Sequence, residues 1–317
     1  MTSAIRTREL SKDYYVGFWR PRPYRALDRL SIDVAEGDVY GFLGPNGAGK
    51  TTTLKLLMQL IFPTSGRASI LGRPAGDLAV KRRIGYLPEN PYFYDHLTAE
   101  ELVSYFAGLF GYAGRDRTAR ARRLLDEVGI GAERRLPLRK FSKGMVQRVG
   151  LAQALVNDPD VIFLDEPMSG LDPLGRRQVR SLILRLRDEG RTVFFSSHIL
   201  SDAEALCSRV AVLAEGRLVS VGRVSDLVTF ESQGWEAVVD GLPTAVVERL
   251  TGVVRRSERI AEGRYTLEFP VDQPPERVLA DLLAAGGRVI SVNPVRKSLE
   301  DVFVQQVAGA SRRRVES

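Results

Sequence analysis

The sequence lacks the features that mark secreted and membrane-spanning chains. Among its 317 residues there is a single cysteine, Cys207, which cannot form an internal disulfide. No uninterrupted apolar run approaches the roughly 18 residues that a membrane span requires. The first residues, Met1 to Arg6, contain no apolar stretch of the kind found in a secretory signal. We therefore expect a cytoplasmic protein that does not itself cross a membrane.

The sequence also has no concentrated block of like charge. Its 46 basic and 39 acidic side chains give a net charge of +7, but the arginines are scattered along the chain. Charge alone therefore does not indicate nucleic acid or an anionic membrane as a partner. What is present is an ordinary globular composition, 44% hydrophobic and 27% charged. The length suits one large domain and a smaller one.

A glycine-rich stretch is the strongest motif in the sequence. It matches the pattern GxxxxGK[ST] and follows the strand-like run Val39 to Leu43. Glycines let backbone N–H groups surround a polyphosphate, and a helix starting near Lys50 points its positive end at the same anion. The alternative is a glycine-rich turn with an accidental Lys-Thr pair. The nucleotide-binding residues predicted here are Gly44, Pro45, Asn46, Gly47, Ala48, Gly49, Lys50, Thr51 and Thr52.

Within this motif two side chains have separate expected tasks. Lys50 is expected to reach the β- and γ-phosphates as a mobile positive charge. The Thr51 hydroxyl is expected to ligate Mg²⁺. The motif thus predicts a polyphosphate ligand bound together with Mg²⁺.

Two carboxylates end a second buried-strand pattern. Val161 to Leu164 are all apolar, and Asp165 and Glu166 follow them. Open α/β sheets bind ligands at the carboxyl edge of their strands, which is where these side chains would lie. Asp165 is expected to hold Mg²⁺, through water, and Glu166 to accept the proton of the attacking water. Taken alone, such a strand end could instead cap a helix.

A third strand pattern, Val193 to Ser197, ends at His198, one of two histidines in the chain. A lone histidine at a strand end is usually structural. Because this one falls at the same sheet edge as Asp165 and Glu166, a contact with the γ-phosphate is the favoured interpretation.

The remaining patterns before residue 130 indicate two subdomains. Residues 5–10 and 26–34 read as strands of a long antiparallel hairpin. Its loop, residues 17–24, mixes aromatic and basic side chains, and fits a solvated tip or a contact with headgroups or a partner equally well. A short strand and turn are predicted at 66–72, and a buried strand stopped by Pro88 is predicted at 84–89. From Thr98 to about Val128 apolar residues recur at helical spacing, which predicts a helical subdomain inserted between two strands of an α/β core.

The order of these motifs resembles the ATP-binding subunit of ABC transporters over about residues 4–225. Gly44 to Thr51 matches the family's Walker A motif, and Val161 to Glu166 its Walker B motif with the catalytic glutamate. Phe141 to Met145 falls where the family signature lies, just before the usual Gln-Arg pair. Residues 169–172 look like the D-loop.

Two further positions carry the resemblance. Tyr14 sits where the family has the aromatic residue that stacks on adenine, and His198 looks like the switch histidine. The resemblance implies a P-loop NTPase core of α/β class, with an antiparallel β subdomain and a helical subdomain at about residues 90–156. It also implies a head-to-tail dimer with two ATP molecules between the subunits. Lys50, Glu166 and His198 are then the expected catalytic residues.

The sequence departs from the family pattern at two places. Lys143 and Met145 replace a glycine and the glutamine of the usual LSGGQ signature, whereas Ser142 and Gly144 remain. These two supply a hydroxyl and a close backbone N–H, enough to hold the γ-phosphate across the dimer. Such relaxed signatures look like those of the drug- and polymer-exporting branch, which pairs with separate membrane subunits.

The second departure is Glu89, which occupies the place of the family's Q-loop glutamine. A carboxylate there can still ligate Mg²⁺, but it adds negative charge near the γ-phosphate. The expected metal ligands are Thr51, Glu89 and Asp165.

Residues 225–310 read as a separate domain after the ATP-binding domain of residues 1–224. Strands are predicted at 235–239, 252–255, 264–269 and 289–293, and helices at 244–250, 275–285 and 299–307. This βαββαβ order, with a final helix, predicts a ferredoxin-like α+β domain. It has no cluster of His, Cys and carboxylates, which favours a structural, dimer-supporting or regulatory role. Residues 311–317 are predicted to be a basic tail.

The sequence therefore predicts an ATPase that drives export through an integral membrane subunit. We expect a homodimer, or a heterodimer with a related ATPase, placed peripherally on the inner face of the cell membrane. One alternative is a soluble ATPase of the same superfamily acting on nucleic acid or ribosomes. The chain lacks the inserted coiled coil and the second cassette of such proteins, so nucleic acid is not expected as a partner. Another alternative, a nucleotide-gated binding protein without turnover, conflicts with the intact Glu166.

Overall fold

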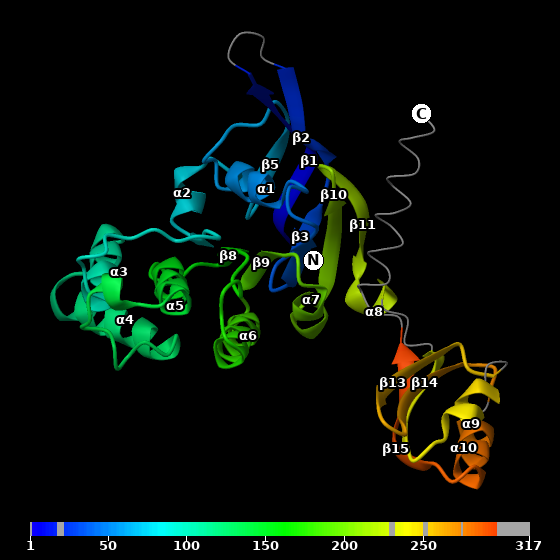
Figure 1. Ribbon diagram of the computed structural model, residues 1–317. Coiled ribbons are helices and arrows are strands. Elements are labelled where there is room, and N and C mark those ends of the chain that lie inside the picture. Colours follow the sequence, from blue (N-terminus) through cyan, green and yellow to red (C-terminus); the bar gives the residue numbers. More distant parts are fainter. Residues whose placement is uncertain (1, 18–21, 228–231, 250–252, 274, 297–317) are drawn as a thin grey trace. The chain divides into compact units, whose positions relative to one another are not determined.

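The computed structural model describes residues 2–17, 22–227, 232–249, 253–273 and 275–296. Internal contacts divide these residues into two units, the first ending at Val224 and the second beginning at Ser225 (Figure 1). Within the described ranges, no helix combines the length and the apolar character that a bilayer span requires. In the part of the chain that the structure describes, the first unit contains two sheets and the second contains one.

The first unit contains a mainly parallel six-stranded sheet. Its order is β11 (Arg217–Arg223), β10 (Arg209–Ala214), β4 (Val39–Leu43), β9 (Thr192–Ser197), β8 (Val161–Asp165) and β7 (Ile84–Leu87). The strands β10 to β7 in this order are parallel, and β11 is antiparallel to β10. Every residue of β4, β8 and β9 is buried, as their apolar runs predicted. The carboxyl ends of these three strands meet at one edge.

Aromatic packing holds the three central strands together. The ring of Phe194 on β9 lies 5.6 Å from that of Tyr40 and 5.2 Å from that of Phe42, both on β4. It also lies 5.8 Å from the ring of Phe163 on β8. All four side chains are fully buried, so this cluster fixes the spacing of the strand ends that carry the polar residues.

Helices cover this sheet, and their ends follow local sequence signals. They are α1 (Lys50–Leu57), α6 (Pro173–Asp188) and α7 (Leu200–Leu206). Asp172 caps α6 by accepting a hydrogen bond of 2.7 Å from the backbone N–H of Gly175, with Pro173 at the first helical turn. The buried face of α6 includes Val179 and Ile183.

An antiparallel sheet forms the amino-terminal part of this unit. Its order is β2 (Arg22–Leu30), β1 (Ser3–Val16), β5 (Ser65–Ile70) and β6 (Arg73–Pro74), and β3 (Asp33–Ala35) also pairs with β1. The pairing of β1 with β2 confirms the predicted hairpin. Of the predicted loop at 17–24, residues 18–21 lie outside the described residues. Residues 22–24 belong to β2, so this part of the loop prediction is wrong.

The prediction of one continuous strand over residues 26–34 is wrong. Strand β2 ends at Leu30, and the chain resumes as β3 at Asp33. Thr7 of β1 bridges the interruption, because its hydroxyl donates to Leu30 O and accepts from the N–H of Ile32. Arg29 has a positive φ of 50°, which turns the chain just before the break.

The helical subdomain lies between β7 and β8 in the sequence. It contains α3 (Ala99–Leu109), α4 (Gly114–Glu127), the short η1 (Leu138–Lys140) and α5 (Lys143–Ala154), and it follows the short α2 (Leu78–Lys81). Thr98 and Glu101 form a capping box at the start of α3. The predicted helical insertion is confirmed.

The second unit has the predicted βαββαβ order. Its elements are β12 (Ser232–Asp240), α9 (Thr244–Arg249), β13 (Arg256–Ala261), β14 (Arg264–Pro270), α10 (Pro275–Ala284) and β15 (Arg288–Arg296), preceded by α8 (Val224–Leu227). The sheet is antiparallel in the order β13-β14-β12-β15, which is the ferredoxin-like arrangement. Its core includes Ala237, Val239, Leu267, Phe269 and Leu282.

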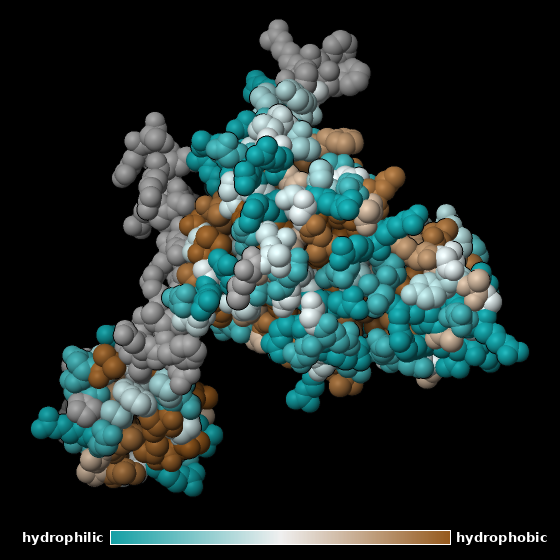
Figure 2. Space-filling model, turned by 180° about the vertical axis from the view of Figure 1, so that it is seen from behind, coloured by the Kyte–Doolittle hydropathy of each residue, from teal (hydrophilic) through white to brown (hydrophobic). Residues whose placement is uncertain are grey.

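Part of the prediction for this unit is wrong or falls outside the described residues. The strand expected at 252–255 begins instead at Arg256. The helix expected at 299–307 and the tail at 311–317 lie outside the described residues. Apolar surface is visible on this unit in Figure 2, and its exposed apolar side chains include Ile260, Val271, Leu283 and Ile290.

Candidate active site

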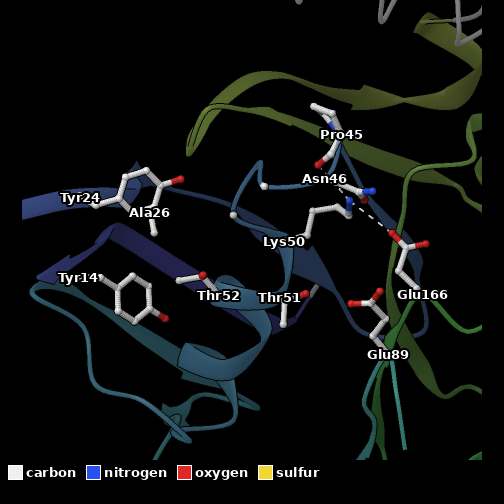
Figure 3. A pocket seen from close by; sticks show the side chains of 12 residues that line it. Tyr14, Tyr24, Ala26, Pro45, Asn46, Lys50, Thr51, Thr52, Glu89 and Glu166 are labelled. Atoms are coloured by element: carbon white, nitrogen blue, oxygen red, sulfur yellow. Dashed lines mark hydrogen bonds and ion pairs between the residues drawn. The ribbon is translucent and has the colours of Figure 1, made fainter. Parts of the chain in front are cut away.

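A cavity of about 440 Å³ lies beside the glycine-rich loop that joins β4 to α1. Figure 3 shows two tyrosines at one end of it, Lys50 nearer the middle, and two glutamates at the other end. Its lining is Tyr14, Tyr24, Ala26, Pro45, Asn46, Gly47, Gly49, Lys50, Thr51, Thr52, Glu89 and Glu166. The structure thus brings together most of the site residues expected from the sequence. Of the rest of the loop, Gly44 accepts a hydrogen bond from Lys50 and Ala48 is buried.

The loop can adopt its backbone conformation only with glycine at several positions. Gly47 and Gly49 have φ of 81° and 102°, which residues other than glycine rarely adopt. A Cβ at Gly44 would lie 2.5 Å from Leu213 O, and one at Gly49 would lie 2.6 Å from Ala26 O. Helix α1 begins at Lys50 without a side-chain cap and without an acidic residue in its first turn. Its first N–H groups are therefore available to an anion.

Lys50 is held by oxygen atoms on several sides. Only 6% of the residue is exposed, and Nζ donates to Gly44 O at 2.7 Å and to Pro45 O at 3.3 Å. The same nitrogen lies 3.3 Å from Oε1 of Glu166. A buried cation with these neighbours is positioned to exchange protein oxygens for phosphate oxygens.

Asp165 is the last residue of β8 and is fully buried. Its Oδ1 accepts a hydrogen bond of 2.5 Å from the Ser196 hydroxyl. Burial raises the pKa of Asp165 above its ordinary value, although hydrogen bonds from Ser196 and Thr51 oppose the rise. Its Oδ2 has no hydrogen-bond partner among the described residues. That oxygen is available for a cation.

Glu166 is placed by the turn that follows β8. Its φ of 49° is unusual for a residue with a side chain, and its N–H donates to Ser196 Oγ at 3.1 Å. Its Oε2 lies 2.9 Å from Nδ1 of His198, which follows β9. Glu166 is 7% exposed, whereas the side chain of His198 is 45% exposed. One carboxylate thus contacts both a lysine and a histidine.

The residues present fit a magnesium ion that is shared with a nucleotide. Mg²⁺ is usually held by one or two carboxylates together with substrate phosphates and water. The unpartnered Oδ2 of Asp165, the Thr51 hydroxyl and the exposed Glu89 carboxylate provide oxygens of this kind. Within the described residues there is no group of three or more His, Cys, Asp or Glu that could hold a metal ion by itself.

Ser142 and Gly144 do not line this cavity. Ser142 caps α5 by accepting from the N–H of Met145 at 3.2 Å. A Cβ at Gly144 would lie 3.1 Å from Cδ2 of Leu171, and one at Gly170 would lie 3.1 Å from the Lys143 side chain. The signature segment is therefore packed against residues 169–172.

Sequence reasoning did not predict Ser196 or two of the lining residues, Tyr24 and Ala26. Ser196 links Asp165 to the backbone of Glu166, and the parallel register pairs Asp165 with Ser196. A signal existed, because both residues stand at polar ends of adjacent buried strands. Tyr24 lines the cavity opposite Tyr14 in the hairpin, and the strand register needed to find it was not available from the sequence.

Comparisons with known proteins agree on one family. Residues 27–169 match the sequence profile of the family described as ABC transporter. The chain is 44% identical over 308 residues to an uncharacterised ABC transporter ATP-binding protein of Synechocystis, covering 96% of this chain and 85% of that one. It is 41% identical over 222 residues to the bacitracin transport ATP-binding protein BcrA of Bacillus licheniformis, covering 69% of each chain.

A third relative and a solved structure extend this result. The chain is 33% identical over 307 residues to a fluoroquinolones export ATP-binding protein of Mycobacterium tuberculosis, covering 96% of this chain and 93% of that one. The ATP-binding cassette MJ0796, in a dimeric post-hydrolysis state bound to ADP and Pi, matches with a TM-score of 0.64. That match has 26% identity and covers 69% of this chain and 98% of the other.

Proposed function

The chain belongs to the ATP-binding proteins of ABC transporters, and on that premise we propose that it drives export through a separate membrane-spanning subunit. The observation that carries the export proposal is the match to the fluoroquinolones export ATP-binding protein. It extends over 96% of this chain and so includes residues of the second unit as well as the ATPase unit.

In the proposed mechanism, the loop at residues 44–49 and the start of α1 bind the phosphates of ATP. Their N–H groups and the Lys50 ammonium face the β- and γ-phosphates, where the ammonium gives up its carbonyl partners. Tyr14, at the far end of the cavity, stacks on the adenine. The triphosphate therefore runs from the tyrosines toward the glutamates.

Hydrolysis is assigned to Glu166 and its neighbours. Glu166 takes the proton of the attacking water, and its contact with His198 orients the carboxylate while leaving the half-exposed imidazole near the γ-phosphate. Thr51 and Asp165 would hold Mg²⁺, with Glu89 at the same end, and the ion would neutralise charge on the phosphates. Ser196 positions both carboxylate residues.

We further propose that two subunits complete each site. Ser142 and Gly144 lie outside the cavity of their own chain, at an α5 amino terminus packed on residues 169–172. In a head-to-tail dimer they would face the γ-phosphate bound by the other chain. The dimer is a homodimer or a heterodimer with a related ATPase, on the inner face of the membrane.

The test is co-purification from detergent-solubilised membranes, followed by reconstitution in liposomes. The export proposal expects a multi-span protein to co-purify and to stimulate ATP hydrolysis by this chain. Lys50→Ala should abolish the stimulated activity without preventing co-purification. Stimulation by nucleic acid or ribosomes, with no membrane protein recovered, would instead support the soluble-ATPase alternative and overturn the export proposal.

A further inference from the structure

Tyr24 lines the same cavity as Tyr14, at the end opposite the carboxylates (Figure 3). The two tyrosines are direct partners in the antiparallel pairing of β1 with β2. Directly opposed residues of an antiparallel pair project from the same face of the sheet, with Cβ atoms about 4.5–5.5 Å apart. Both rings therefore belong to the same face of the hairpin.

Backbone packing fixes this face relative to the phosphate loop. Ala26, which follows Tyr24 by two residues at an irregularity in the β1–β2 pairing, is 6% exposed and also lines the cavity. Its carbonyl oxygen approaches Gly49 so closely that a Cβ there would lie 2.6 Å from it. The N–H of Asp28 donates to Gly216 O at 2.8 Å. The position of Tyr24 is thus set by the strand that passes over the loop.

The surroundings of the two rings differ. The Lys12 ammonium lies 5.3 Å from the centroid of the Tyr14 ring, as in a cation–π contact. Tyr24 is 54% exposed. On the other face of the hairpin, Arg25 is tied to Asp13 at 2.7 Å. An exposed aromatic ring that lines a cavity beside a phosphate-binding loop has the properties of a base-binding surface.

We propose that Tyr24 is a second aromatic contact for the purine base of ATP, acting beside Tyr14. Stacking needs only the π-face of a base, which the ring of Tyr24 can contact. This inference rests on the proposed assignment of the cavity to ATP. It goes beyond that assignment, because Tyr24 then contributes to affinity for the base and not for the phosphates.

The test compares ATP with inorganic tripolyphosphate, which has the phosphates but no base, by calorimetric titration of the full chain. Tyr24→Ala should raise the Kd for ATP about 5- to 20-fold, as expected for loss of one base–aromatic contact. Its Kd for tripolyphosphate should stay within about twofold of the parent. Tyr24→Phe keeps the ring and should bind ATP as the parent does. Tyr15→Ala is the matched control, because Tyr15 is 72% exposed on the same hairpin and does not line the cavity.

Two results would overturn the inference. One is unchanged ATP affinity in Tyr24→Ala. The other is equal weakening of ATP and tripolyphosphate, since the substitution would then act on the loop or on the fold. Lys50→Ala separates this failure from failure of the site assignment, because it should weaken both ligands. Parental ATP affinity in Lys50→Ala would overturn the site assignment, and the role of Tyr24 with it.

Discussion

The hydroxyl of Ser196 donates a hydrogen bond of 2.5 Å to the buried carboxylate of Asp165. The two residues are register partners in the parallel strands β8 and β9, so strand pairing itself brings them together. Burial raises the pKa of Asp165, and negative charge on Glu89 and Glu166 adds to the rise. Hydrogen bonds from Ser196 and Thr51 lower it. Each of these neighbours can be removed by mutation, and the direction in which the pKa of Asp165 should then move is defined.

Ser196→Ala should move the acid limb of the pH profile of ATP hydrolysis, where activity falls as pH is lowered, to higher pH. The substitution removes a donor that favours the carboxylate, so the pKa of Asp165 rises further and more of it is protonated at acid pH. A protonated carboxyl is a poor ligand for Mg²⁺. The measurement is kcat/KM for ATP against pH, which reports the free enzyme.

Ser197→Ala is the matched control for that experiment. Ser197 is also buried, but its hydroxyl donates to Ile199 O and not to Asp165. The acid limb of Ser197→Ala should coincide with that of the parent. If Ser196→Ala also leaves the limb in place, the ionisation of Asp165 does not control the acid side of the profile.

Asp165 contributes to the pH dependence of folding stability with a sign opposite to that of an ordinary salt-bridged aspartate. Because the folded-state pKa of Asp165 lies above its unfolded value, the folded chain takes up a proton as pH falls through this range. The ionised group therefore costs stability in full above the folded-state pKa. This cost declines as pH falls below that pKa, and it is gone only below the unfolded-state pKa. The site keeps a carboxylate that the fold by itself would prefer protonated, which suggests a functional reason for its burial.

Glu166→Gln should retain ATP affinity and lose hydrolysis by about a hundredfold or more. The amide keeps the size of the side chain but cannot accept the proton of water, while the loop contacts to phosphate remain. Lys50→Ala should instead lose nucleotide binding, since its charge acts before and during the reaction. Equilibrium binding and single-turnover rates separate the two outcomes. Hydrolysis by Glu166→Gln within a few-fold of the parent would show that another group is the base.

In the proposed dimer each site is completed by Ser142 and Gly144 of another subunit, so the specific activity of the chain should rise with its concentration. In mixed dimers Gly144→Asp should suppress a parental partner, since it places negative charge beside the γ-phosphate. Ala113→Asp is the control, as it adds the same charge at the exposed start of α4. Activity that is independent of concentration, together with equal behaviour of the two variants on mixing, would contradict a shared site.

Much of the fold could be predicted because its signals are local. The runs Val39 to Leu43 and Val161 to Leu164 are apolar throughout, which is typical of buried parallel strands. The break between β2 and β3 could not be predicted, because it depends on Thr7, which is 23 residues from Leu30. The position of strand β13 was predicted wrongly because all of its residues are exposed, so the sequence shows no alternation of apolar and polar residues there.

The site divides in the same way. Lys50, Asp165 and Glu166 stand in short motifs whose chemistry can be read from residue type and spacing. Ser196 and Tyr24 have no such motif, because their roles depend on which residues face them across a strand pair. Register is set by the packing of whole strands, so it is available only once the sheet is assembled.

Glu89 is the remaining departure from the family pattern, and it is exposed at the carboxylate end of the cavity. The carboxylate of Glu89 would repel the phosphates of a bound nucleotide. Two unit charges roughly 6 Å apart interact by about 3 kcal/mol at an effective dielectric of about 20, and the solvent exposure of Glu89 reduces this figure. The repulsion acts on Asp165 as well, because the charge on Glu89 adds to the rise in its pKa. Binding of Mg²⁺ would offset much of it.

Glu89→Gln should therefore act in the direction opposite to Ser196→Ala. Removing the negative charge lowers the pKa of Asp165, so the acid limb of kcat/KM should move to lower pH. Because Glu89 is an expected ligand of Mg²⁺, its replacement should also weaken the dependence of hydrolysis on Mg²⁺ concentration, while basal turnover stays within about tenfold. Glu36→Gln, which removes an exposed charge outside the cavity, should change neither property. An unchanged Mg²⁺ titration and an unchanged acid limb in Glu89→Gln would show that this side chain takes no part in the site.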